Sequence, residues 1–273
     1  MSQECGCGIV GGFSVDGQPE SKPKTSHEHH HEHDHPHDDA RASGADNRQQ
    51  VPVHQSLLEH NDRLAERNRG FFRAKGLLVL NVLSAPGSGK TAFIQKTAEV
   101  LGERVRVGVV VGDLATDNDA ARLRAAGVPV VQITTGTVCH LEADMVARAM
   151  TKLNLDALDV LIIENVGNLV CPAAYDLGEH LRVVLLSVTE GEDKPLKYPP
   201  LFHSAQVAII TKGDLSIPAG FDRERALANL HRISHHARIF EVSSRSGQGM
   251  EEWCEFLEQA ARQAKSAPAD EAL

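Results

Sequence analysis

The sequence predicts an α/β fold in which a mostly parallel, seven-stranded sheet is covered by helices on both faces. The first observation is a series of short runs rich in Val, Ile and Leu, which read as strands. The second is that stretches with helical patterning separate these runs along the chain. Strands without polar alternation are typical of parallel sheets, because such sheets are buried on both faces.

The strands are expected at 77–83, 105–111, 128–133, 159–165, 182–188, 206–211 and 237–242. Helices are expected after Lys90, Asp117, Cys139, Asp222 and Gly249. One more helix precedes the first strand and ends at Gly76, because apolar residues recur there near helical spacing. Ligands of such sheets bind beyond the carboxyl ends of the strands, so the loops that follow the strands are expected to carry the function.

Composition divides the chain of 273 residues into three parts. Residues 1–54 lack a sustained apolar run and are expected to form a disordered arm, residues 55–265 one domain, and residues 266–273 a disordered tail. The net charge of −9 argues against a general nucleic-acid binder, which needs a basic face. No apolar run is long enough to span a membrane, and the N-terminus lacks a secretory signal, so we expect a cytoplasmic protein with thiols rather than disulfides.

The first expected strand runs into SAPGSGKTAF, which matches the phosphate-loop pattern G-x-x-x-x-G-K-[S/T] except that Ser84 takes the first position. Small residues let the backbone turn its N–H groups onto phosphate oxygens, a lysine meets their charge, and a hydroxyl holds Mg²⁺. The alternative is a glycine-rich turn that only caps a helix. The strand before the loop and the helix after it favour a phosphate loop. Its expected phosphate-binding residues are Gly87, Ser88, Gly89, Lys90, Thr91 and Ala92.

A late strand ends in ITKGDL, which resembles the N-K-x-D motif of GTPases. The Asp of that motif accepts both guanine N–H donors, a pair that adenine lacks. Here Thr211 replaces the Asn, while Lys212 and Asp214 are kept. Downstream, EVSSRSG resembles the loop whose backbone contacts the guanine oxygen, which places Ser243 and Ser244 near the base. An ordinary surface turn is the alternative for Lys212 and Asp214 taken alone; the phosphate loop upstream favours GTP.

Two other loops each bring a thiol beyond the end of a strand. TTGTVCHLEADM carries Cys139 and the adjacent His140, and IIENVGNLVCP carries Cys171. Thiolate and imidazole together suit Zn²⁺ or Ni²⁺, and a fourth ligand would come from water or a second subunit. The alternative is that these residues belong to the core, as we expect for Cys254 on a helix face.

Five ordered blocks together resemble the HypB family of hydrogenase-maturation GTPases: GDLATDNDAARL, TGTVCHLEADM, ENVGNLVCPA, SVTEGEDKPLKYP and VSSRSGQGMEEW. The resemblance runs from about residue 55 to residue 258. It implies a P-loop NTPase fold of the SIMIBI class, slow GTP hydrolysis, dimerisation with GTP, and help in delivering nickel to [NiFe]-hydrogenase. The implied partners are a second copy of the chain, a HypA-type nickel chaperone and the precursor of the hydrogenase large subunit.

The resemblance also implies roles around the nucleotide. Lys90 would contact the phosphates, and Thr91 and Asp113 would face Mg²⁺ or its waters. Glu164 stands where other GTPases have the Asp of D-x-x-G, so it would orient either the waters of Mg²⁺ or the attacking water. Lys194, in EGEDKP, reads equally well as a nucleotide or interface residue and as a solvated lysine.

Three metal sites follow from the same resemblance. Zn²⁺ or Ni²⁺ would bind at the dimer interface through Cys139, His140 and Cys171. Some family members begin with C-x-x-C-G-C, a tight nickel site; here Ser2 replaces the first cysteine, and the two that remain, Cys5 and Cys7, close fewer coordination positions. Members with histidine-rich tracts are thought to buffer nickel, as SHEHHHEHDHPHDD would do here.

That stretch, residues 26–39, holds seven of the fifteen histidines of the chain. A purification tag or a merely solvated run is the alternative, but the tract is internal and interleaved with acids, and imidazole nitrogen suits Ni²⁺ and Zn²⁺. Its expected metal ligands are His27, His29, His30, His31, His33, His35 and His37.

Three functions remain in view. The first is a GTP-hydrolysing nickel metallochaperone for [NiFe]-hydrogenase whose histidine-rich arm stores nickel. The second is a nickel storage protein with a vestigial GTPase, and the third is a urease-type nickel-delivery GTPase. The ENVGNLVCP and SVTEGEDKPLKYP blocks favour the hydrogenase branch.

Overall fold

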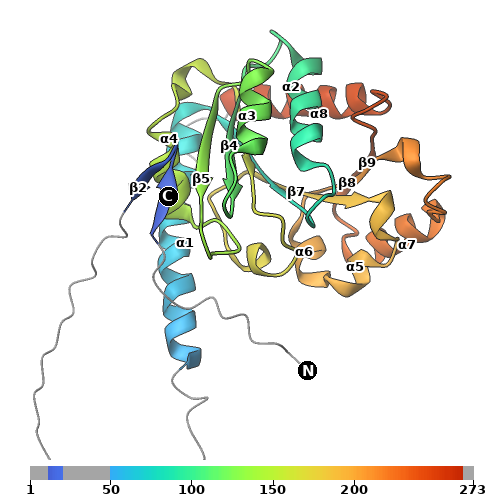
Figure 1. Ribbon diagram of the computed structural model, residues 1–273, viewed down its shortest axis with the longest axis horizontal. Coiled ribbons are helices and arrows are strands. Elements are labelled where there is room, and N and C mark those ends of the chain that lie inside the picture. Colours follow the sequence, from blue (N-terminus) through green and yellow to red (C-terminus); the bar gives the residue numbers. More distant parts are fainter. Residues whose placement is uncertain (1–11, 21–49, 267–273) are drawn as a thin grey trace, which may run out of the picture.

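The computed structural model describes residues 12–20 and 50–266 (Figure 1). All seven expected strands are present and lie side by side in one sheet. They are β3 (Leu78–Leu83), β4 (Val107–Asp113), β5 (Val130–Thr134), β6 (Val160–Glu164), β7 (Leu181–Ser187), β8 (Val207–Thr211) and β9 (Arg238–Glu241). Every pairing among these seven strands is parallel, which confirms the predicted fold class.

The sheet has nine strands rather than seven, in the order β2-β1-β5-β4-β6-β3-β7-β8-β9. The two extra strands, β1 (Phe13–Val15) and β2 (Gln18–Glu20), form a hairpin that pairs antiparallel with β5. The expectation of a disordered arm is therefore wrong for these residues, and also for residues 50–54, which belong to the first helix. Asp16 and Gly17 both have positive φ, at 47° and 75°, as a tight hairpin turn requires. Phe13 and Val15 are buried in the core, which holds the hairpin in place.

Helices follow Lys90, Asp117, Cys139, Asp222 and Gly249 as predicted, and the first helix ends at Lys75, directly before Gly76 as expected. The helices are α1 (Gln50–Lys75), α2 (Lys90–Leu101), α3 (Asn118–Ala125), α4 (Ala143–Met150), α5 (Lys194–Lys197), α6 (Pro199–Ser204), α7 (Arg223–Ile233) and α8 (Met250–Ser266). The short helices α5 and α6 were not expected. Prolines stand in their first turns, where the missing N–H costs nothing.

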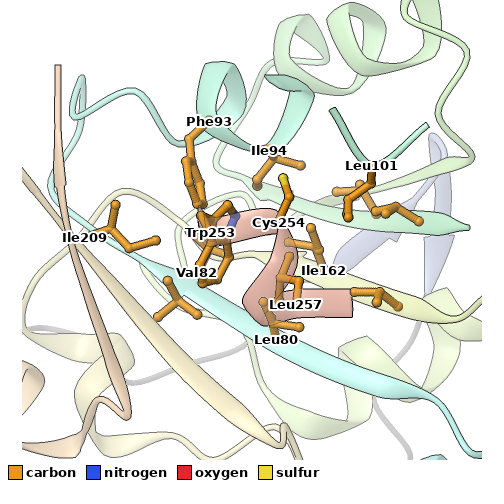
Figure 2. Close-up of a cluster of buried hydrophobic side chains, with 14 of the residues drawn as sticks. Leu80, Val82, Phe93, Ile94, Leu101, Ile162, Ile209, Trp253, Cys254 and Leu257 are labelled. Atoms are coloured by element: carbon orange, nitrogen blue, oxygen red, sulfur yellow. The ribbon is translucent and has the colours of Figure 1, made fainter. Parts of the chain in front are cut away.

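One face of the sheet is covered by α2, α3 and α8. Figure 2 shows the centre of this layer, where Trp253 of α8 packs between Phe93 and the strands. The indole N–H of Trp253 donates to the hydroxyl of Thr97, 3.0 Å away, so its one polar group is satisfied. Cys254 is fully buried beside it, and burial raises the pKa of its thiol to about 12, which confirms that Cys254 is a core residue.

The other face is covered by α1 and α4 on one half and by α6 and α7 on the other. The buried face of α1 carries both apolar and polar side chains. Ala65 and Phe72 are buried there, and so are Asn61 and Asn68. Asn61 accepts a hydrogen bond from the N–H of Ala143 at the start of α4, 2.9 Å away. Within the described ranges, no helix combines the length and apolar character needed to cross a bilayer.

Because the seven parallel strands run the same way, their carboxyl ends meet at one edge of the sheet. The phosphate-loop sequence follows β3, and the ITKGDL and EVSSRSG loops follow β8 and β9. The two thiol-bearing loops follow β5 and β6. The order of the sheet therefore brings all the predicted site loops to the same edge.

Candidate nucleotide site and metal centre

The loop from Ser84 to Lys90 joins β3 to α2 as a phosphate loop should. Gly87 and Gly89 have φ values of 73° and 96°, which side chains with a Cβ rarely adopt. Their positive φ turns the loop so that α2 begins at Lys90, and Thr91 and Ala92 lie in its first turn. The free N–H groups of this first turn form an anion site by geometry alone. Ser88 is fully buried at the loop's centre.

Ser84, the departure from the glycine pattern, lies inside the loop. Its hydroxyl accepts hydrogen bonds from the Lys90 ammonium, 3.1 Å away, and from the Ser88 hydroxyl, and it donates to the Ala85 carbonyl. Burial lowers the pKa of Lys90, while the charges of Glu164 and Asp119 oppose that shift. The serine therefore holds the lysine inside the loop, an interaction that glycine could not make.

Glu164, at the end of β6, points its carboxylate at the phosphate loop. The hydroxyl of Thr91 donates to its Oε1 at 2.8 Å. Its Oε2 is buried and finds no hydrogen-bond partner among the described residues. Burial raises the pKa of Glu164 to about 7, although Lys90 opposes the shift. A carboxylate oxygen without a partner beside a threonine hydroxyl is the oxygen-rich setting that Mg²⁺ prefers, so the residues present fit that cation.

Asp113, at the end of β4, is fixed by its own loop. Its Oδ1 accepts hydrogen bonds from the N–H of Ala115 at 2.9 Å and from the N–H and hydroxyl of Thr116 at 2.7 and 3.1 Å. Partial burial opposes ionisation, but these donors outweigh it and keep the pKa of Asp113 below its ordinary value. An ionised carboxylate therefore stands close enough to influence Lys90.

The ITKGDL loop is tied to the phosphate loop by two hydrogen bonds. The ammonium of Lys212 donates to the carbonyl of Gly87 at 2.7 Å, and the hydroxyl of Thr211 donates to the carbonyl of Ser88 at 2.9 Å. Lys212 takes a left-handed conformation with φ 59°, which turns the chain toward Asp214. Thr211 thus links the two loops through its hydroxyl, without the asparagine of the usual motif.

Asp214 and Ser243 meet at the end of the sheet formed by β8 and β9. The Ser243 hydroxyl donates to Oδ1 of Asp214 at 2.6 Å, and the N–H of Ser246 donates to the Ser243 hydroxyl at 3.1 Å. The N–H of Gly213 donates to the carbonyl of Val242 at 3.1 Å. These hydrogen bonds join the two loops, and Ser244 lies partly exposed beside them.

Cys139, His140 and Cys171 come together as predicted. One ligand atom from each lies within 4.8 Å of the others, and the two sulfur atoms are 2.8 Å apart. The imidazole of His140 is 3% exposed and stacks on the ring of Tyr175, with ring centroids 3.8 Å apart. Within the described ranges, no other three His, Cys or acidic side chains converge in this way. Two thiols and an imidazole at these separations suit a soft or borderline divalent metal.

The predicted residues that remain are Lys194 and the candidate ligands near the N-terminus. Lys194 begins α5 and its ammonium lies over the Tyr198 ring, 5.5 Å from the centroid. The remaining candidate ligands lie outside the described residues: Cys5, Cys7, His27, His29, His30, His31, His33, His35 and His37.

Three residues near the site were not anticipated. Tyr175 stacks on His140, and Thr189 lies 3.4 Å from the Lys212 ammonium. Gly167 packs so closely on the phosphate loop that a Cβ there would lie 3.1 Å from the Cα of Pro86. The Gly in ENVG was visible in the sequence, but its neighbour is distant along the chain, so only the fold reveals the contact.

Comparison with known proteins bears directly on this pair of sites. The family model of the CobW/HypB/UreG nucleotide-binding domain matches residues 78–241. The hydrogenase maturation factor HypB of Azotobacter chroococcum mcd 1 is 51% identical over 221 residues, which is 80% of this chain and 72% of that protein. HypB of Escherichia coli (strain K12) is 45% identical over 240 residues, or 88% of this chain and 83% of that protein.

The chain belongs to the HypB family of hydrogenase maturation factors. Two solved HypB structures share its fold. HypB from Helicobacter pylori, crystallised in complex with nickel, is 42% identical with a TM-score of 0.72, covering 76% of this chain and 98% of that one. HypB from Archaeoglobus fulgidus is 41% identical with a TM-score of 0.70, covering 74% and 99%.

Membership of the HypB family confirms the resemblance drawn from the five sequence blocks. It also accounts for the combination seen here, a nucleotide-binding fold with a thiol and imidazole cluster on the same edge of the sheet. The matched domain begins at β3 and ends at β9, so it contains the phosphate loop, both thiol-bearing loops and the ITKGDL loop.

Proposed function

We propose that this HypB-family chain is a GTP-hydrolysing nickel metallochaperone that serves the maturation of [NiFe]-hydrogenase. The observation that carries the proposal is the arrangement of β6. Its carboxyl end supplies Glu164 to the phosphate loop, and the segment that follows supplies Cys171 to the metal cluster. A change around the nucleotide therefore acts directly on the segment that holds a metal ligand.

The nucleotide chemistry rests on positioning and charge. Lys90 and the N–H groups of the first turn of α2 bind the phosphates, and Lys212 and Asp214 bind guanine. Thr91 and Glu164, with Asp113 nearby, would hold Mg²⁺, which would supply positive charge against the phosphates. Glu164, whose second oxygen is buried without a partner among the described residues, orients a water molecule. Attack of this water on the γ-phosphorus breaks the bond to the bridging oxygen and releases GDP and phosphate, slowly, as suits a switch.

Cys139, His140 and Cys171 bind the cargo. Nickel is the proposed cargo because HypB of Helicobacter pylori was crystallised with it, and Zn²⁺ suits the same three ligands. A second copy of the chain, bound when GTP is present, completes the coordination at a shared interface. A HypA-type chaperone and the precursor of the hydrogenase large subunit, in the cytoplasm, are the proposed partners in transfer.

Two variants test the nucleotide assignment. Lys90→Ala is expected to abolish measurable GTP hydrolysis, because it removes the ammonium that Ser84 holds inside the phosphate loop. Asp214→Asn is expected to weaken GTP binding roughly 10- to 100-fold, since a hydrogen bond to a charged group contributes about 1.5–3 kcal/mol, and to improve binding of xanthosine triphosphate. Normal GTP hydrolysis by Lys90→Ala would exclude this site.

Metal analysis and mass measurement of the pure protein, with GDP and with a GTP analogue, test the rest. The proposal predicts nickel or zinc bound through the Cys139 cluster and a dimer with the GTP analogue only. Cys139→Ala should remove that metal while leaving the fold intact. If Cys139→Ala left hydrogenase maturation unchanged, the chain would act mainly as a nickel store.

The histidine-rich tract is proposed to be a many-site nickel buffer. Deleting residues 27–37 should lower the amount of nickel bound per chain and slow hydrogenase maturation only when nickel is scarce. Loss of maturation even in excess nickel would show that storage is too small a role for the tract.

A further inference from the structure

Asn165 lies between the nucleotide site and the metal cluster. It follows Glu164 directly at the end of β6, and its side chain is 1% exposed. Its Oδ1 accepts hydrogen bonds from the N–H of Leu141 at 3.2 Å and from the N–H of Val166 at 2.9 Å. Because Leu141 follows His140 in the chain, the Asn165 oxygen fixes the backbone beside a metal ligand.

The amide nitrogen of Asn165 connects this residue to the neighbouring strand β3. Its Nδ2 donates to Oδ1 of Asn81 at 3.1 Å, and Nδ2 of Asn81 donates to Oε1 of Glu179 at 3.1 Å. Asn81 lies in the middle of β3 and is fully buried, and Glu179 is 5% exposed. Burying polar side chains among apolar ones is unfavourable unless each is hydrogen-bonded. The burial of each of these three side chains therefore depends on the hydrogen bonds that it makes with the others.

From Glu179 the hydrogen bonds continue through Arg182 of β7 to the loop that carries Cys171. Its Nε donates to Oε1 of Glu179 at 2.7 Å, and its terminal nitrogens donate to the carbonyls of Ala173 at 3.0 Å and Tyr175 at 2.8 Å. These carbonyls belong to the segment that begins with Cys171. Tyr175 itself stacks on His140, so the circuit closes at the metal cluster.

The segment from Glu164 to Gly167 also contacts the phosphate loop. Glu164 accepts from the Thr91 hydroxyl, and Gly167 packs against Pro86 of the phosphate loop. The short segment from Glu164 to Gly167 therefore contacts the phosphate loop at both ends and the His140 loop in between. A shift of this segment would move the Asn165 side chain and, through its contacts, both thiol-bearing loops.

We propose that Asn165, Asn81 and Glu179 are positioning residues of the metal centre, and that Asn165 transmits the state of the nucleotide site to Cys139, His140 and Cys171. The proposal rests on the proposed function for the identities of nucleotide and metal. The positioning itself depends only on the contacts above, so it can be tested without either.

The first experiment measures backbone hydrogen exchange of the full-length chain without metal or nucleotide. In Asn165→Ala, the N–H of Leu141 and the segment 173–177 should exchange at least 10-fold faster than in the unsubstituted chain. Asn165→Asp keeps an oxygen for Leu141 but cannot donate to Asn81, so it should loosen only the segment 173–177. Unchanged exchange in both variants would overturn the positioning role.

The second experiment measures Ni²⁺ affinity from the thiolate-to-nickel absorption band. The full-length chain carries Cys5→Ser and Cys7→Ser, so that Cys139, Cys171 and the buried Cys254 are its remaining cysteines. Asn165→Ala should weaken Ni²⁺ binding roughly 10- to 100-fold, the usual cost of losing a residue that orients a metal ligand. It should also abolish the difference in affinity between the GDP-bound and GTP-analogue-bound forms, and Asn165→Asp should recover part of the affinity.

Thr97→Val is the matched control, because it removes a buried hydrogen bond to Trp253 on the opposite face of the sheet. It should lower the unfolding temperature while leaving Ni²⁺ affinity and its nucleotide dependence unchanged. Equal loss of affinity in Thr97→Val and Asn165→Ala would reduce the effect to general destabilisation and overturn the proposal. Absence of the nickel band in the chain with intact Asn165, with the hydrogen-exchange differences present, would instead contradict the proposed function.

Discussion

The hydroxyl of Thr211 donates a hydrogen bond to the carbonyl oxygen of Ser88, 2.9 Å away, and so joins the end of β8 to the phosphate loop. Both residues are buried. Thr211→Val keeps the shape of the side chain but removes the donor, which should cost about 0.5–1.5 kcal/mol of unfolding free energy and weaken GDP binding. Denaturant unfolding and calorimetry would measure both effects. Thr211→Ser, which keeps the hydroxyl, should stay close to the unsubstituted chain in both measurements.

Glu164 should be needed for hydrolysis and dispensable for folding. Glu164→Gln keeps an oxygen for the Thr91 hydroxyl but removes the charge that Mg²⁺ would meet. We expect GTP hydrolysis to fall at least roughly 10²-fold, the scale of a positioned acid–base group, and more Mg²⁺ to be needed for half-maximal activity. The unfolding temperature should not fall, because a buried carboxylate is poorly solvated. Undiminished turnover in the Gln variant would remove Glu164 from the mechanism.

Gly178 should tolerate no side chain. Its φ is 87°, and a Cβ there would lie 2.5 Å from the carbonyl oxygen of Ala65 in α1. Gly178→Ala combines a left-handed alanine, about 1–2 kcal/mol, with overpacking of about 1–3 kcal/mol. Gly220→Ala is the control, since Gly220 has φ 62° with open space around it and should suffer only the first effect. Urea unfolding would compare them; equal losses would refute the close contact with α1.

His180 should make the chain less stable in acid. Its Nδ1 accepts a hydrogen bond from the N–H of Val79 at 3.1 Å, so the ring is neutral there. Burial lowers the pKa of His180 from 6.5 to about 4. The unfolded chain therefore binds a proton at this residue more readily, and the stabilisation present above pH 6.5 is lost as the pH falls toward 4. Solvent contact reduces the effect to about 2 kcal/mol.

His180→Asn is the variant that isolates this effect, because its amide oxygen can accept from Val79 and does not titrate. Unfolding free energies of the two proteins between pH 7 and pH 4 should converge as the pH falls. Parallel pH profiles would show that His180 is not held neutral.

Much of the fold was predictable from local pattern. The unbroken apolar strands lie where the sequence placed them, because a strand buried on both faces cannot carry polar alternation. The hairpin at Phe13 to Glu20 was missed although FSVDGQ carries its signal, an Asp-Gly turn beside alternating apolar residues. Composition of the whole N-terminal segment outweighed that short local pattern.

The sequence by itself determined the phosphate loop, the ITKGDL loop, the two thiol-bearing loops and the family, because each is a contiguous block whose residue types and order are diagnostic. Only the tertiary structure decided what a polar residue inside an apolar strand does. Asn81 interrupts LLVLNVL without any local explanation, and its partners Asn165 and Glu179 lie 84 and 98 residues away. Hydrogen bonds between strands that are adjacent in the sheet and distant in the chain leave no spacing for a sequence pattern to detect.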